Sequence, residues 1–243
     1  ALMVVADQNR SGEVSSAALM RFDLESGDLQ RTALGQLTAV DRPATAAANL
    51  LPPATDPLTG KPATSTIQLA PTSAGAAATS ADGFTYVVGT SRGDAGRQLG
   101  DGKDDLMLTK MDISGTIVWQ RTLGTGGTAE GAAITLAPGG RIIVAGTAAG
   151  EVDGVTSDGD MLVACFATDG EEQFATLIRA VGADRATSVT TGLDGTILVG
   201  GQTATGQAVL AKVDGTGRLT SRSILTNDGS SSIRGVQVAT DGS

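Results

Sequence analysis

The sequence lacks histidine altogether and is short of cysteine and aromatic residues. Its 243 residues include one Cys, one Trp, one Tyr and four Phe. Without histidine the chain can form neither a Ser-His-Asp or Cys-His nucleophile nor a histidine metal site. A single cysteine excludes an intrachain disulfide. The net charge of −9 at pH 7, together with so few aromatic rings, argues against nucleic acid as a partner.

Long hydrophobic runs are missing as well. The longest apolar stretches hold about seven residues, too few for a membrane-spanning helix. One of them, 161–167, contains Cys165, for which we expect a buried and unreactive thiol. The chain opens on residues 1–6 without an initiator Met or a visible signal peptide. This opening is expected of a mature form or of an excerpt of a longer protein.

Glycine is abundant instead, with 34 of 243 residues, and it marks the joints of a repeat. Four times the chain shows an apolar run, an Asp or its substitute, a glycine turn and a second strand-like run. The four apolar runs cover 18–22, 106–111, 161–166 and 208–213. A further turn follows in each copy, at 82–83, 139–140, 194–195 and 241–242.

The spacing of these turns sets the size of the unit. The same interval of 27 residues separates Asp112 from Gly139, Ala167 from Asp194, and Asp214 from Asp241. In the unit that is read most fully, we expect strands at 106–111, 116–123, 132–137 and 141–146. Repeats with about four short strands are typical of β-propeller blades. We therefore predict an all-β, single-domain chain over 1–243, a β-propeller of about four four-stranded antiparallel blades.

The segment from Asp105 to Trp119, DLMLTKMDISGTIVW, resembles the bacterial seven-bladed β-propeller (SBBP) repeat. The resemblance is good over 105–150, fair over 160–243 and weak over 1–90. Trp119 is matched by Phe174 in the next copy, by Leu219 in the last, and by Leu29 or Gln30 in the first. The resemblance implies a propeller in a bacterial extracytoplasmic or surface protein, and it implies no catalytic residues.

The two ends of the sequence carry complementary parts of one repeat. The chain stops at 241–243, where a strand is due, and residues 1–6 have the pattern of that strand. Two explanations fit. The termini complete one shared blade of a closed ring, or the chain is part of a larger propeller that is completed by further repeats or by a partner.

The first copy also holds an insertion, which is a candidate partner-binding site. Asp23 and Asp82 are 59 residues apart instead of 27, and we place the excess at 36–66, inside the first blade. Prolines crowd this region, so an extended and irregular segment is expected. One interpretation is a solvent-exposed loop without a specific role. The other is a docking arm that binds a protein partner or a larger assembly through Leu50, Leu51, Pro52 and Pro53.

Acidic loops before two of the apolar runs are a candidate metal site. Hard oxygen ligands on glycine-containing loops suit Ca²⁺, and solvated acidic turns are the alternative. The candidate ligands are Asp101, Asp104, Asp105, Asp158 and Asp160.

From these features we expect a non-catalytic structural or protein-interaction propeller of a bacterial surface or appendage-associated protein, located outside the cytoplasm, secreted or on the cell surface, with no cofactor. A Ca²⁺- or glycan-binding propeller is the alternative, and a carboxylate-based hydrolase or lyase is the third.

Overall fold

The computed structural model describes residues 2–8, 16–22, 24–26, 28–33, 72–92, 103–180, 182–225 and 229–239. These residues form fifteen β-strands and one short 3₁₀ turn (Pro138–Gly140). The strands are β1 (Leu2–Gln8), β2 (Ser16–Phe22), β3 (Leu29–Ala33), β4 (Thr72–Thr79), β5 (Thr85–Ser91), β6 (Asp105–Met111), β7 (Ile117–Leu123), β8 (Gly126–Leu136), β9 (Ile142–Val152), β10 (Val155–Phe166), β11 (Glu172–Ile178), β12 (Arg185–Thr191), β13 (Ile197–Gln202), β14 (Ala208–Val213) and β15 (Leu219–Leu225).

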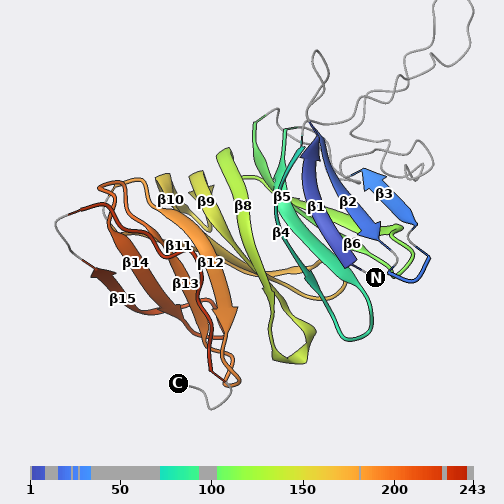
Figure 1. The fold of residues 1–243 in the computed structure, drawn as a ribbon. Coiled ribbons are helices and arrows are strands. Elements are labelled where there is room, and N and C mark those ends of the chain that lie inside the picture. The colour runs from blue at the N-terminus through green and yellow to red at the C-terminus, as the bar shows by residue number, and fades with distance from the viewer. Residues whose placement is uncertain are drawn as a thin grey trace, which may run out of the picture.

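The strands make four antiparallel sheets of consecutive strands. Sheet I is β1-β2-β3, sheet II is β4-β5-β6-β7, sheet III is β8-β9-β10-β11 and sheet IV is β12-β13-β14-β15. The sheets stand side by side in an arc, in which β1 and the β13–β15 region occupy opposite ends (Figure 1). The described residues do not close a ring. Within them, no helix is long and apolar enough to cross a bilayer.

The all-β prediction is confirmed, and three of the sheets have the expected four strands. The boundaries between units differ from the expectation. The strands expected at 106–111 and 116–123 belong to sheet II, whereas those expected at 132–137 and 141–146 belong to sheet III. Likewise β3 and β4, which flank the predicted insertion, lie in different sheets. The insertion itself, 36–66, lies outside the described residues, and its place within a blade stays a prediction.

Apolar side chains fill the spaces between neighbouring sheets. One cluster, which includes Tyr86, Leu108 and Phe166, lies between sheets II and III. Another, which includes Ile143, Val163 and Val213, lies between sheets III and IV. The consecutive apolar residues of β10 are buried because alternate side chains enter the two clusters. Cys165 is fully buried, as expected, and this burial raises the pKa of its thiol.

Hairpin turns of one kind connect the last two strands of sheets II, III and IV. At each turn a glycine adopts the left-handed conformation that favours this residue, with φ of 83° at Gly115, 86° at Gly170 and 92° at Gly217. In the turn of sheet III, Asp169 Oδ1 accepts the amide of Glu171 at 3.0 Å. In the other two turns, the Asp that directly follows the third strand accepts backbone amides through its carboxylate. Asp112 Oδ1 lies 2.8 Å from the amide N of Ser114, and Asp214 Oδ1 lies 3.0 Å from that of Thr216. The recurring Asp and Gly of the sequence are thus turn residues.

Candidate functional site

The four described acidic candidates are distributed over two sheets. Asp104 and Asp105 stand at the start of β6 in sheet II, and Asp158 and Asp160 lie in β10 of sheet III. Asp101 lies outside the described residues. Asp104 makes a two-bonded ion pair with Arg92, with Nε–Oδ1 at 2.8 Å and Nη2–Oδ2 at 2.9 Å. This carboxylate raises the pKa of Arg92.

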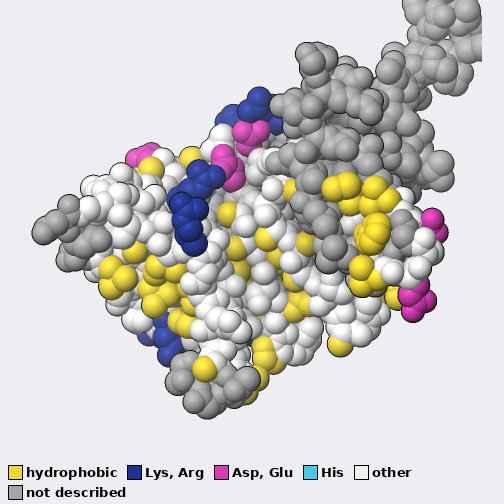
Figure 2. Space-filling model, viewed as in Figure 1, with side chains coloured by type: hydrophobic (Ala, Val, Ile, Leu, Met, Phe, Trp, Pro, Cys, Tyr) yellow, Lys and Arg dark blue, Asp and Glu magenta, His cyan; other side chains and the backbone are white. Residues whose placement is uncertain are grey.

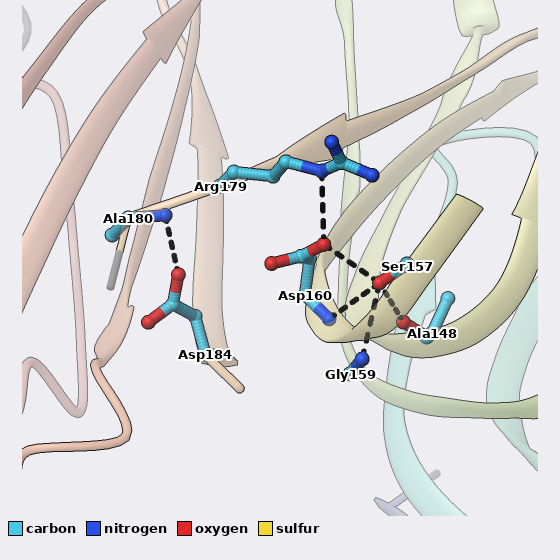
Figure 3. Close-up of polar contacts among 7 residues, drawn as sticks. All are labelled: Ala148, Ser157, Gly159, Asp160, Arg179, Ala180 and Asp184. Atoms are coloured by element: carbon cyan, nitrogen blue, oxygen red, sulfur yellow. Dashed lines mark hydrogen bonds and ion pairs between the residues drawn. The ribbon is translucent and has the colours of Figure 1, made fainter. Parts of the chain in front are cut away.

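Asp160 is part of a structural hydrogen-bond network (Figure 3). Its Oδ2 accepts Arg179 Nε at 3.1 Å and lies 2.7 Å from Ser157 Oγ. The same hydroxyl accepts the amides of Gly159 at 3.1 Å and Asp160 at 2.8 Å. Because this network surrounds an irregularity of register between Asp158 and Asp160, it holds the bend of β10. Asp158, by contrast, is exposed.

The four described candidate calcium ligands are therefore not gathered into one group. In the described ranges, no group of three or more Cys, Asp or Glu side chains is placed to hold a metal ion. Asp104 and Asp160 use carboxylate oxygens in ion pairs with arginines. The calcium site stays a prediction.

A polar pocket of about 520 Å³ lies between the first strands of sheets II and III. Two ion pairs flank it: Arg92 with Asp104, and Arg185 with Glu130 at 3.1 Å. Figure 2 shows basic and acidic side chains next to each other on a face that is otherwise largely uncharged. Since each charge has a partner of opposite sign, this pocket does not present an isolated acid–base pair.

None of the charged residues Arg92, Glu130 and Arg185 in this pocket was predicted from the sequence. A signal for two of them is present in the repeat. Glu130 faces Thr147 in the β8–β9 pair, and Arg185 faces Gln202 at the same place in the β12–β13 pair. Both residues stand just before the irregular step of a first strand. When the repeats are aligned by strand register, Glu130 and Arg185 therefore occupy equivalent positions.

The most regular feature of the molecule is the contact between neighbouring sheets. In the first type of bond, which we call the inner bond, a backbone amide at or next to the first strand of one sheet, or in the segment 229–239 after sheet IV, donates to a carbonyl near the start of the third strand of the preceding sheet. This bond recurs at three equivalent places: Ala129 N to Asp104 O at 2.6 Å, Asp184 N to Gly159 O at 2.7 Å, and Ser231 N to Gly206 O at 2.7 Å.

A second recurring bond joins the outer strands to the next sheet. In each case a side chain of the last strand donates to the carbonyl of the turn glycine. The three bonds are Thr32 Oγ1 to Gly115 O at 2.7 Å, Arg121 Nε to Gly170 O at 3.2 Å, and Thr176 Oγ1 to Gly217 O at 2.7 Å. We call the inner and outer bonds together the junction bonds.

The contact between sheets II and III is reinforced by aromatic residues. Lys110 Nζ lies 4.1 Å from the centre of the Phe84 ring and donates to Thr168 O at 2.9 Å. Trp119 Nε1 donates to the same carbonyl at 3.1 Å. An ammonium group over the face of an aromatic ring is attracted electrostatically by the ring, which favours this position of Lys110.

Strand register corrects one match made from the sequence. Trp119 pairs with Lys110 and Phe174 with Cys165, and the residue in the equivalent place opposite Lys212 is Ser221. The match of Leu219 with Trp119 is wrong. The turn between β14 and β15 has the same length as its counterparts, and this length sets the register.

Residues 229–239 lie against sheet IV in the place of the first strand of a following sheet. Ser231 makes the third inner junction bond. Ile233 N donates to Gly201 O at 3.2 Å, and the Ile233 carbonyl accepts the hydroxyl of Thr187. This relation to sheet IV repeats that of β8 to sheet II.

The candidate docking arm, including Leu50, Leu51, Pro52 and Pro53, lies outside the described residues, and its role stays a prediction.

Comparisons with known proteins support the fold and no activity. No family model matches the chain, and no curated protein matches it. The chain is similar in structure to a protein of unknown function from Bacteroides caccae, with a TM-score of 0.50 and 11% sequence identity. The similarity covers 99% of this chain and 62% of that protein. At this identity the likeness concerns the fold alone.

Proposed function

We propose that the chain is a non-catalytic β-propeller module, in which sheets I–IV are blades and the end blades bind protein. The repeated sheets in an arc and the two series of junction bonds support the assignment as blades. In the described part, sheet I supplies three strands of its blade. A larger propeller, completed beyond this arc, fits the same observations.

The observation that carries the binding role is the incomplete burial of apolar residues at one end of the arc. Leu225 in β15 is 57% exposed, whereas Ile178, its counterpart in sheet III, is fully buried against sheet IV. The two residues are equivalent because Ile178 faces Met161 and Leu225 faces Ala208. An exposed apolar position that is a core position in the preceding blade is suited to binding another protein surface.

The polar groups support a structural role. The ion pair of Asp160 with Arg179 and the junction bonds hold the fold, so these groups are used within the chain. We further propose a location outside the cytoplasm of a bacterium, in a surface or appendage-associated protein. The resemblance of residues 105–150 to the SBBP repeat supports this location.

Photo-crosslinking tests the binding role. The photoreactive residue p-benzoyl-phenylalanine is placed at Leu225, and in a control at Val155, which is 44% exposed in the β9–β10 hairpin. In bacterial cells that produce the chain, we expect protein adducts of the 225 variant after illumination and none of the 155 variant. Equal adducts at both positions, or none at 225, would contradict the proposal.

A further inference from the structure

We infer that this chain associates head to tail with a second copy of itself, the outer face of sheet IV in one copy packing against the outer face of sheet I in the other. This inference rests on the proposed function and names the partner. The evidence is that each end of the arc repeats one side of a contact that the chain already makes internally.

The outer face of sheet IV corresponds to faces that are covered elsewhere in the molecule. Leu198 and Leu210 are half-buried. Their counterparts in sheet III, Ile143 and Val163, are fully buried because sheet IV covers them. The equivalence follows from the pairing of Leu198 with Lys212 and of Ile143 with Cys165.

The opposite end of the arc has the complementary character. Phe22 in β2 is 37% exposed, although Phe166 and Val213 at the same place in sheets III and IV are buried. Those two residues face the preceding sheet, so Phe22 faces away from sheet II. One end of the chain therefore presents the surface that a following sheet covers, and the other presents the surface that a preceding sheet covers.

The strands at the two ends are complementary as well. In sheets II, III and IV, a first strand pairs with a second one, as Val189 of β12 does with Val199 of β13. Residues 229–239 have the place of a first strand, and β1, at the edge of its sheet, has the place of a second. Docking of two copies lays Val236 of one opposite Val4 of the other, which gives sheet I a fourth strand.

Such an interface uses different surfaces on the two copies. It is heterologous, so it closes into a ring when the rotation between copies permits and otherwise extends into a chain of copies. Each such contact covers the sheet IV end of one copy and the sheet I end of the other, in the way that sheets III and IV cover each other. The contact buries the leucines of the first copy and the phenylalanine of the second, and a closed ring buries both sets in every copy.

The mass of the purified chain in solution tests this inference. Sedimentation velocity from about 1 to about 100 μM covers the usual range of specific association. We expect a species of at least twice the chain mass. The double substitution Leu198→Lys and Leu210→Lys is expected to weaken association at least about tenfold and to leave the melting temperature within a few degrees. The control Val155→Lys retains association. A monomer at the highest concentration, or association that the double substitution leaves unchanged, overturns the inference.

Disulfide trapping tests the register. Val4→Cys and Val236→Cys are made in separate chains, which are then mixed under mild oxidation. We expect a disulfide-linked dimer in the mixture and not in either variant alone. If no disulfide-linked dimer forms in the mixture, the proposed pairing is overturned. If the purified chain is a monomer while position 225 still crosslinks to another protein in cells, this inference fails and the proposed function stands. If no protein crosslinks there either, both fail.

Discussion

At the scale of single residues, the turn aspartates Asp112 and Asp214 have a stabilising role that depends on ionisation. Asp112 Oδ1 accepts the amides of Ser114 and Thr116, and Asp214 Oδ1 accepts those of Thr216 and Arg218. The neighbouring side-chain hydroxyls of Ser114 and Thr216 are the largest cause that lowers the pKa of each aspartate, and the backbone amides add to it. The charged form is therefore favoured in the folded chain.

The pH dependence of stability follows from this shift. Since the pKa in the folded chain lies below that in the unfolded chain, near 3.9, the stabilisation is fully present above that value. It is lost as the pH falls through the folded pKa. We expect Asp112→Asn with Asp214→Asn, which keeps the Oδ1 acceptors, to reduce the loss of stability between about pH 5 and pH 2. Urea midpoints measured across this range check the effect, and an unchanged slope would contradict it.

At the scale of elements, each first strand bends where it crosses a glycine of the second strand. A Cβ atom built on Gly146 would lie 1.7 Å from the carbonyl oxygen of Glu130. Gly89 and Gly201 have the same relation to Ser73 and Arg185, at 2.0 and 2.1 Å. Only glycine permits this approach, which lies beside the irregular step of the strand.

We expect Gly146→Ala to destabilise the fold by about 1–3 kcal/mol, since the backbone of β8 or β9 must move to admit the methyl group. Gly235→Ala is the matched control, because a Cβ there meets no atom within 4 Å. Its effect should stay within about 0.5 kcal/mol. Urea unfolding measures both, and equal effects would show that the close approach is not what requires glycine.

The strands themselves could be predicted from apolar runs and turn residues, but their grouping into sheets could not. The expected strand 106–111 matches β6, and 116–123 matches β7. The expected strand 132–137 starts late, because β8 begins at Gly126 with small and polar residues that pair through their backbone. Only two residues connect β7 to β8, as short a link as a hairpin turn. Loop length therefore does not reveal that a new sheet begins there.

The candidate site was harder to predict for a related reason. The pattern of apolar residues identifies the core, and the apolar run 161–167 correctly predicted that Cys165 is buried. The pairing of Arg185 with Glu130 joins residues in different sheets. Such a contact depends on the order of the sheets and on the bends of their first strands, neither of which local sequence encodes.

At the scale of the whole molecule, burial is graded along the arc. Sheet III has apolar clusters on both faces. The last eight residues of β10 are all buried, whereas β15 is mostly exposed. Regions with many buried contacts open least often.

We expect amide hydrogen exchange to follow this gradient. Amides of β9 and β10 should exchange slowest, and those of β15 should exchange at least about tenfold faster, since local opening free energies span a wide range within one fold. Exchange followed by mass spectrometry on the intact chain resolves these segments. Uniform protection from β9 to β15 would mean that the arc opens as one cooperative unit.

The junction bonds have a consequence for divergence. Every one of them ends on a backbone carbonyl, and the outer donors are Thr32, Arg121 and Thr176, which share only a hydrogen-bonding group. A backbone acceptor is present whatever side chain mutation installs. Selection can therefore preserve this architecture while most positions drift. The chain and the Bacteroides caccae protein share a fold at 11% sequence identity, and backbone acceptors of this kind are compatible with such different sequences.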